Sequence, residues 1–262
     1  PLSKASFHNF MAQKDFAAIN VTIPYKEMVI PYLDCIDPKA EAIGAVNTIV
    51  NKNNRLYGYN TDYDGFRYML VKHKIDPRGK KVLLLGKGGA AKACISVVTD
   101  MGAKEVLTVY YKENPETISY DACYQNHGDA QIIINTTPVG MFPNTEHSPI
   151  DLSSFERLEA VVDVVYNPLR TQFVLDGISK GVIAVGGLEM LIGQAKCAVA
   201  IFLEKKVEDS ITHRLYSSLL EERSNLVLIG MSGCGKTTLG KKAAECLGKT
   251  FIDIDEEIVN EI

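Results

Sequence analysis

The 262-residue chain is long enough for one large domain or two ordinary ones, and its 46% apolar and 23% charged residues are typical of a globular protein. Its net charge of −4 argues against a general nucleic-acid or anionic-membrane binder, and no apolar stretch reaches the roughly 18 residues that a membrane helix needs. The six cysteines form no C-x-x-C pair, so they indicate reduced thiols and a cytoplasmic location rather than a zinc site or a disulfide framework.

The first part of the chain is expected to combine short helices with short strands. The expected helices are Leu2–Gln13, Tyr25–Tyr32 (a short helix or turn) and Asp62–Lys74. The expected strands are Phe16–Ile23, Ala42–Asn51 and Arg55–Tyr59. A hairpin turn at residues 52–54 joins the last two strands, and the turn Asp76-Pro77-Arg78-Gly79 marks a domain boundary.

Beyond this turn, buried strand patterns alternate with helical patterns, which predicts an α/β fold with a parallel sheet and helices on both faces. The expected strands are Lys81–Leu85, Glu105–Tyr111, Ala130–Asn135, Val161–Val165 and Val182–Val185. The expected helices are Gly88–Met101, a weak one at Glu116–Asn126, Thr171–Lys180, Leu188–Lys205 and Ser210–Glu222.

Residues 81–93 combine an apolar strand, a glycine-rich turn and the start of an alanine-rich helix. The turn is G-x-G-x-x-A in the strand-to-helix context of a dinucleotide-binding fingerprint. Gly86 allows the sharp turn, Gly88 lets the backbone approach a pyrophosphate, and Ala91 keeps the helix close to the sheet. Free N–H groups at the helix start would bind the phosphate oxygens. The alternative is a tight turn of an α/β protein that binds nothing.

Two polar stretches before the glycine loop carry candidate catalytic groups. Lys26 projects just past Pro24 at a strand end, Asn47 lies on a strand, and Asp62 begins a helix. A lysine and a carboxylate beside a dinucleotide can serve as acid and base, because an alcohol loses its proton as the hydride leaves. Each residue alone also has a structural interpretation, as a solvated lysine, a turn asparagine or an N-cap aspartate.

Seven segments resemble, in order, the motifs of the shikimate dehydrogenase family: NVTIPYK, AVNT, GYNTD, GKGGAAKA, NTTPVGM, DVVYNPL and GGLEMLIGQA. Members of this family are NADP-linked oxidoreductases that interconvert 3-dehydroshikimate and shikimate in aromatic amino-acid biosynthesis. The resemblance implies a substrate-binding α/β domain at residues 1–76 and 200–222 and a Rossmann-like NADP domain at residues 77–199. Quinate and quinate/shikimate dehydrogenases share these motifs and stay open as alternatives.

The resemblance also implies roles for individual residues. Lys26 and Asp62 would form the catalytic pair. The implied substrate-binding residues are Thr22, Asn47, Gln194 and, at the junction with the nicotinamide, Tyr166. The implied cofactor-binding residues are Gly86, Gly88, Gly89, Ala90, Lys112, Thr136, Val164, Gly187 and Met190.

The chain departs from the family in two places. Where the family usually has Asn-Arg-Thr, whose arginine holds the 2′-phosphate of NADP, this chain has Tyr110-Tyr111-Lys112. We expect Lys112, with Lys87, to supply the charge, so NADP is preferred over NAD by a modest margin. The family also opens with a glycine-rich strand and a Ser-x-Ser segment, and neither precedes Pro1. We therefore expect the substrate domain to be truncated at its N-terminus.

A second glycine-rich loop lies near the end of the sequence, after an expected strand at Leu226–Ile229. Residues 230–237 read G-x-x-x-x-G-K-T, a phosphate loop in which Lys236 reaches the β/γ-phosphates of ATP and Thr237 binds Mg²⁺. The loop glycines are Gly230, Gly233 and Gly235. The segment resembles the opening of shikimate kinase, which implies a truncated kinase domain at 224–262 with Asp253 near Mg²⁺ and Asp255 on shikimate. The alternative is that both acids face water.

We interpret the whole chain as an interior segment of a fused, multifunctional shikimate-pathway enzyme. Its expected partners are the small-molecule substrate and neighbouring pathway domains, with no nucleic acid and no membrane. The competing hypothesis is a catalytically silent fragment that binds only nucleotide.

Overall fold

The computed structural model describes residues 4–112 and 115–261 of the chain. The chain divides into two compact units, Pro1–Leu220 and Glu221–Ile262, which are described separately. In the described part of the chain, none of the helices has the length and apolar character of a membrane span.

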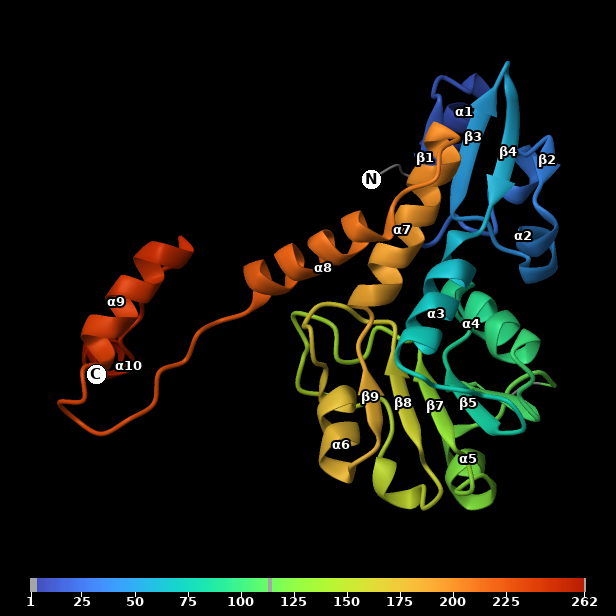
Figure 1. Ribbon diagram of the computed structural model, residues 1–262. Coiled ribbons are helices and arrows are strands. Elements are labelled where there is room, and N and C mark those ends of the chain that lie inside the picture. The colour runs from blue at the N-terminus through green and yellow to red at the C-terminus, as the bar shows by residue number, and fades with distance from the viewer. Residues whose placement is uncertain (1–3, 113–114, 262) are drawn as a thin grey trace. The chain divides into compact units, whose positions relative to one another are not determined.

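The first lobe of the larger unit is a four-stranded sheet with the strand order β1-β3-β4-β2 (Figure 1). Only the β2–β4 pair is parallel. The strands are β1 (Ala18–Asn20), β2 (Cys35–Ile36), β3 (Thr48–Lys52) and β4 (Arg55–Tyr59). The helices are α1 (Lys4–Gln13), the 3-10 turn η1 (Ile30–Tyr32) and α2 (Pro38–Ile43). Phe7 and Met11 of α1 pack with Ile49 and Leu56 of the sheet in one core.

Two expected elements of this lobe are wrong. Ala42–Asn51 is not one strand, because residues 38–43 form α2 and β3 begins only at Thr48. The α2 helix is capped at both ends: the Asp37 side chain accepts a hydrogen bond from Lys39 N, and Gly44 ends the helix at φ 68°. The β1 strand is shorter than Phe16–Ile23, since its pairing with β3 ends at Asn20. The expected helix start at Leu2 lies outside the described residues.

The second lobe is a five-stranded, fully parallel sheet with the order β6-β5-β7-β8-β9. Its strands are β5 (Lys81–Leu85), β6 (Glu105–Val109), β7 (Ile132–Asn135), β8 (Ala160–Asp163) and β9 (Ile183–Val185). Leu85 pairs with Asn135, and Asn135 pairs with Asp163. The carboxyl ends of three strands therefore meet in one row, the edge where open α/β sheets bind their ligands.

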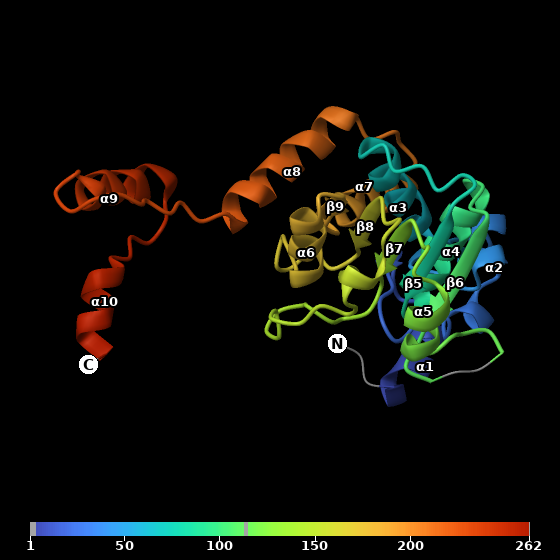
Figure 2. The same ribbon diagram turned by 90° about the horizontal axis from the view of Figure 1, so that it is seen from below.

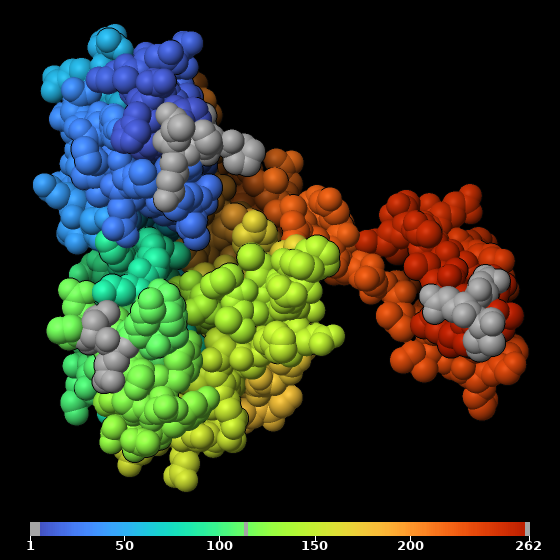
Figure 3. All heavy atoms as spheres, turned by 180° about the vertical axis from the view of Figure 1, so that it is seen from behind, coloured from blue at the N-terminus to red at the C-terminus, as the bar shows by residue number. Residues whose placement is uncertain are grey.

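Helices cover both faces of this sheet (Figure 2), so the predicted fold class is confirmed. One face carries α3 (Thr61–Lys72), α4 (Gly89–Asp100) and α7 (Leu188–Leu203). The other carries α5 (Tyr120–Asn126), α6 (Gln172–Lys180) and the 3-10 turn η2 (Leu152–Ser154). Figure 3 shows the first lobe, in blue, beside the second, in green to yellow. The α7 helix continues without a break through the expected boundary between residues 199 and 200.

Helices α3 and α7 cross with an unusually close backbone approach, because Gly65 and Gly193 lie at the crossing. A Cβ at Gly65 would lie 2.6 Å from Met190 O and 2.7 Å from Gln194 N. A Cβ at Gly193 would lie 3.0 Å from Gly65 Cα. The crossing fixes the first turn of α3 against the middle of α7, which is where the site residues Asp62 and Gln194 lie.

Helix α8 (Asp209–Arg223) crosses the division between the units, and the smaller unit then contains α9 (Lys236–Leu247) and α10 (Ile254–Glu261). The expected strand at Leu226–Ile229 is wrong: residues 224–230 have no regular secondary structure. A strand needs a neighbour to take its backbone hydrogen bonds, and the described residues of this unit form no second strand.

Candidate functional site

Lys26 and Asp62 come together at the junction of the two lobes. Lys26 Nζ lies 2.6 Å from Asp62 Oδ2, and the two side chains are 13% and 9% exposed. At this distance the ammonium donates a short, charge-assisted hydrogen bond to the carboxylate. A pair that is mostly shielded from water but still partly exposed can exchange a proton with a bound hydroxyl.

Local hydrogen bonds hold both backbones in place. Lys26 O accepts a hydrogen bond from Val46 N at 2.8 Å, which ties the residue to the start of β3. Asn60, not Asp62, caps α3: its side chain accepts from the N–H groups of Asp62 and Tyr63 and donates to Ala45 O. The Asp62 carboxylate therefore does not cap the helix, and it accepts a hydrogen bond from Lys26 instead.

A polar network lies beside this pair. Asn47 is buried, and its Oδ1 accepts from Thr61 N at 2.8 Å and from the Thr48 hydroxyl at 3.0 Å. The Thr61 hydroxyl lies 3.2 Å from Asn47 Oδ1 and 3.3 Å from Gln194 Oε1. Because Thr61 N and Thr48 already donate to Asn47, the one proton of the Thr61 hydroxyl can go to Gln194, which leaves both amide nitrogens as donors. Thr61 thus joins Asn47 to Gln194, and no role of its own was expected for it from the sequence because these contacts are tertiary.

Thr22 and Tyr166 both lie in exposed connections. Thr22 is exposed, and its carbonyl oxygen accepts from Tyr25 N in the turn that carries Lys26. Tyr166 lies in the loop after β8 with 39% of its surface exposed. Their expected contacts with the substrate stay predictions.

The glycine loop fits a dinucleotide pyrophosphate. Gly86 turns out of β5 at φ 108°, and a Cβ there would lie 2.7 Å from Thr136 Oγ1. Gly88 is the N-cap of α4 with no side-chain cap, and a Cβ at this position would meet nothing within 4 Å. The first N–H groups of α4, including those of Gly89 and Ala90, therefore have no side-chain cap at the positive end of the helix, where phosphate groups bind.

The far wall of the cofactor edge is built on a buried carboxylate. Asp163 accepts hydrogen bonds from Asn135 Nδ2 at 3.0 Å, Val165 N at 2.9 Å and the Thr171 hydroxyl at 2.6 Å. Burial raises the pKa of Asp163 to about 6, while these hydrogen bonds act in the opposite direction. Asn135 in turn accepts from the Thr137 amide and hydroxyl, so the loops after β7 and β8 are fixed together.

The remaining expected cofactor residues lie after β7 and β8 and in the first turn of α7. The Thr136 hydroxyl donates to Leu85 O at 2.6 Å, which joins the loop after β7 to the end of β5. A Cβ at Gly187 would lie 2.2 Å from Val164 O, so α7 begins where only glycine fits. Met190 is buried in the next turn of the helix.

The end of β6 carries the expected 2′-phosphate residues. Lys112 is exposed, and its Nζ lies 5.4 Å from the ring centre of Tyr111. Lys87 forms a 2.9 Å ion pair with Glu116, which lowers the Glu116 pKa. The structure thus places two cations near the strand end, one of them already bound to a carboxylate.

Comparison with known proteins identifies the larger unit. A shikimate dehydrogenase (NADP(+)) of Clostridium beijerinckii is 41% identical over 208 residues, covering 76% of each chain. The chain belongs to the shikimate dehydrogenase family. The family model of the shikimate dehydrogenase substrate binding domain matches residues 3–49, which include Thr22, Lys26 and Asn47.

Solved structures of this family have the same fold. Shikimate dehydrogenase 1 of Peptoclostridium difficile superposes with a TM-score of 0.78 at 37% identity, covering 86% of each chain. A shikimate 5-dehydrogenase of Thermus thermophilus, in complex with NADP(H) and shikimate, has a TM-score of 0.72 at 27% identity and covers 83% of this chain and 85% of its own.

The smaller unit carries the second glycine loop. The shikimate kinase family model matches residues 232–262. Lys236 Nζ donates to Gly230 O at 2.7 Å and to Met231 O at 2.8 Å, so the lysine closes over its own loop. Gly233 and Gly235 have positive φ angles of 77° and 87°. The Thr237 hydroxyl donates to Asp253 Oδ2 at 3.2 Å, while Asp255 is exposed in the first turn of α10.

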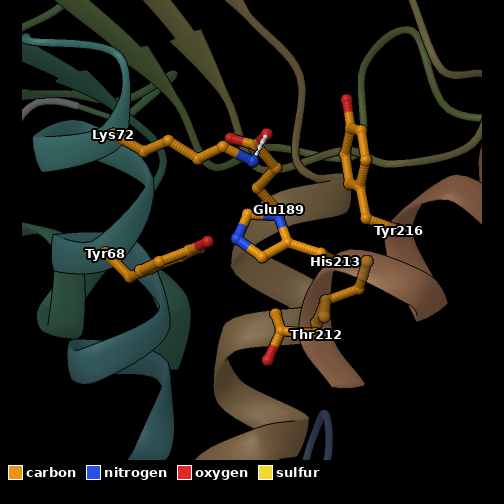
Figure 4. Close-up of a pocket in the computed structure, with 7 residues that line it drawn as sticks. Tyr68, Lys72, Glu189, Thr212, His213 and Tyr216 are labelled. Atoms are coloured by element: carbon orange, nitrogen blue, oxygen red, sulfur yellow. Dashed lines mark hydrogen bonds and ion pairs between the residues drawn. The ribbon is translucent and has the colours of Figure 1, made fainter. Parts of the chain in front are cut away.

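A separate shallow pocket lies between α3, α7 and α8, lined by Tyr68, Lys72, Glu189, Ile192, Thr212, His213 and Tyr216 (Figure 4). Lys72 Nζ reaches across it to Glu189 at 2.6 Å, and His73 pairs with the same carboxylate at 2.5 Å. The Glu189 carboxylate in the pocket wall is therefore already bonded to two neighbouring side chains. No cluster of three metal-ligating side chains is found in residues 4–112 and 115–261.

Proposed function

We propose that the chain is an NADP-dependent dehydrogenase that interconverts shikimate and 3-dehydroshikimate. The Lys26–Asp62 pair beside the glycine loop carries this proposal: a Cβ at Gly89, at the pyrophosphate end of α4, would lie only 3.1 Å from Lys26 Cδ. A proton-transferring pair and a hydride-accepting cofactor are thus accommodated side by side. The curated relatives of the family carry this activity in their names.

The chemistry divides between the cofactor and the chain. NADP⁺, when bound, accepts the hydride from the carbon that bears the hydroxyl. Lys26 and Asp62 hold this hydroxyl and take up its proton, and the ammonium charge stabilises the negative charge that develops on the oxygen. In the reverse direction the same pair returns the proton to the carbonyl oxygen.

Asn47 and Gln194 would bind the remaining ring hydroxyls through their amide nitrogens, with Thr61 holding both amides in position. Thr22 would close the outer side of the substrate, and Tyr166 would lie between substrate and nicotinamide. Residues 1–76 with 200–222 would thus hold the substrate, and residues 77–199 the cofactor.

The N–H groups at the start of α4 would bind the pyrophosphate of NADP, supported by Gly86, Gly88, Gly89 and Ala90. Thr136, Val164, Gly187 and Met190 would line the remaining cofactor edge. Lys112 would supply charge to the 2′-phosphate from the end of β6.

We also propose a second nucleotide site at Gly230–Thr237. Lys236 bonds to a carbonyl of its own loop, and on binding ATP it would donate to the phosphates instead. Thr237 and Asp253 would hold Mg²⁺, and Asp255 would contact shikimate. This segment supports a multifunctional enzyme with neighbouring pathway domains, and six free thiols support a cytoplasmic location. Titration with ATP and Mg²⁺ tests the site, and equal heats from the parent and a Lys236→Ala variant would disprove it.

The dehydrogenase is tested by following NADPH absorbance after adding shikimate and NADP⁺ to the purified chain. We expect turnover with shikimate to exceed turnover with quinate, and NADP⁺ to be used better than NAD⁺. Binding of NADP⁺ by calorimetry without any shikimate-dependent NADPH would disprove the enzyme and leave only a nucleotide-binding protein.

A further inference from the structure

The start of the cofactor helix touches the catalytic lysine. Gly89 is the first residue of α4 after its N-cap Gly88. A Cβ at Gly89 would lie 3.1 Å from Cδ and 3.4 Å from Cβ of Lys26. The 3.1 Å distance is shorter than ordinary carbon–carbon packing, whereas 3.4 Å is ordinary contact, so a side chain at position 89 would displace the Lys26 stem by a few tenths of an ångström at Cδ.

Further contacts hold the Lys26 segment against α4. Lys92, one turn beyond Gly89, forms a 2.9 Å ion pair with Glu27, the residue after Lys26. Cys94 is fully buried in the same helix, and burial, followed by the nearby Asp62 charge, raises the pKa of its thiol, so it packs beside the pair as a neutral group. The segment that carries Lys26 therefore packs directly against the first turns of α4.

The two neighbouring glycines face different surroundings. A Cβ at Gly88 would meet no atom within 4 Å. A Cβ at Gly89 would point at Lys26 instead. Both residues have ordinary negative φ, so alanine fits the backbone at either position. The effects of the two alanine substitutions on kcat and Kd can therefore be compared, because neither substitution strains the backbone.

We propose that Gly89 is a positioning residue for Lys26: the missing side chain in the first turn of the cofactor helix sets the place of the lysine stem and therefore the Nζ–Asp62 contact. At Gly88 the missing side chain leaves room for the pyrophosphate, whereas at Gly89 it leaves room for Lys26 and the backbone N–H still faces the pyrophosphate end of the helix. The kinetic part of this inference rests on the proposed dehydrogenase function, whereas its structural part does not.

The test compares Gly89→Ala with the matched control Gly88→Ala in the full chain. Misplacement of a reacting group by about 1 Å can cost about 100-fold in rate, so a displacement of a few tenths of an ångström by Gly89→Ala should lower kcat about 10-fold. Its Kd for NADP⁺, measured by calorimetry, should stay within about twofold, since alanine keeps the backbone N–H group of position 89. Gly88→Ala should raise this Kd about 10-fold, and in its crystals the Lys26 Nζ–Asp62 Oδ2 distance should stay at the 2.6 Å of the parent.

A double-mutant cycle and a crystal structure decide the cause. If Gly89 acts through Lys26, adding Gly89→Ala to Lys26→Ala should change the remaining kcat less than about twofold. In crystals of Gly89→Ala, Lys26 Nζ should lie farther from Asp62 Oδ2 than the 2.6 Å of the parent. An unchanged distance, or a raised Kd with normal kcat, would overturn the inference. If the parent shows no turnover at all, the proposed function fails, and the crystallographic distance still decides this inference.

Discussion

The chain contains two glycine-rich loops that each lead into a helix. The lysine beside each helix start comes from a different part of the chain. The loop at residues 86–90 contains Lys87, which pairs with Glu116, but the lysine beside its helix start is Lys26, from another lobe about sixty positions earlier in the sequence. The loop at residues 230–237 contains its own lysine, Lys236, which bonds to the carbonyls of the same loop. The first arrangement depends on tertiary structure, whereas the second is local.

The surroundings of the two loops differ in the same way. The first loop follows β5, whose residues Val82–Leu85 are buried in the middle of a parallel sheet. The second follows residues 224–230, where Ile229 is 93% exposed and no strand forms. A phosphate loop can thus take its local shape from glycines and a helix start alone, but a catalytic pair beside it requires a packed core. The predictions below test this contrast, beginning with the largest expected effect.

Removing the distant lysine should have the largest effect. Lys26→Ala should lower kcat for shikimate oxidation by ~10²-fold or more, the contribution of a positioned acid or base, with a smaller change in KM. Lys104→Ala is the matched control, because Lys104 is exposed and lies away from the pair. Steady-state assays at saturating NADP⁺ measure both variants. Near-normal kcat in Lys26→Ala would mean that the first loop needs no outside lysine.

The anchoring of the loops can be compared through their glycines. Gly86→Ala forces an alanine to φ 108° and brings its Cβ within 2.7 Å of Thr136 Oγ1, so we expect the free energy of unfolding to fall by about 2–4 kcal/mol. Gly233→Ala meets only the backbone penalty at φ 77°, about 1–2 kcal/mol, in a unit without a sheet. Urea unfolding measures both substitutions. Equal destabilisation would contradict the view that the first loop alone is fixed by its neighbours.

The cofactor edge beside the first loop should respond to pH through Asp163. Because its pKa rises from 3.8 to about 6 on folding, the folded protein holds this proton more tightly between these values. The contribution of Asp163 to stability should therefore decrease as pH rises through this window and stay level above it, by about 2–3 kcal/mol in total.

Asp163→Asn is the matched variant for this effect, since it keeps the shape of the side chain and cannot titrate. The difference in unfolding free energy between parent and variant should change across the window from 3.8 to about 6 and stay constant above it. A flat difference across this window would show that Asp163 does not titrate there. Denaturant unfolding at a series of pH values measures the difference.

The smallest effect is expected at Lys112. This lysine is exposed at the end of β6, where salt screens its charge, so Lys112→Ala should shrink the preference for NADP over NAD by only about three- to fivefold. The kcat/KM ratio of the two cofactors measures the preference, with Lys104→Ala again as the control. An unchanged ratio would remove Lys112 from the recognition of the 2′-phosphate.

The sequence predicts the second lobe well because its signals are local and periodic. The strand Lys81–Leu85 has the predicted bounds, and α4 differs from its predicted bounds by one residue at each end. Helix α2 was not predicted from the sequence, although Asp37 before it, Pro38 at its first position and Gly44 after it are ordinary helix-end signals. The strand predicted at residues 226–229 failed because an apolar run does not show whether a pairing strand exists.

The site could be predicted less completely from residue patterns. The resemblance of the motifs brought Lys26 and Asp62 together as an expectation, and their distance is 2.6 Å. The contacts of Thr61 with Asn47 and Gln194 could not be predicted, because they join segments that are far apart in the sequence. The roles of these residues remain predictions for the experiments above.

The close crossing of α3 and α7 makes helix register a constraint on the site. Successive residues of an α-helix are rotated by about 100°, and Asp62 and Gly65 lie on one helix, facing Lys26 and α7 respectively. One residue inserted between them would keep the glycine crossing but turn the carboxylate away from the lysine. Extra residues at the β3–β4 turn, where Asn53 and Asn54 have positive φ, would leave this register intact. An insertion in the β3–β4 hairpin turn would thus leave the site intact, whereas an insertion in the first turn of α3 would disrupt it.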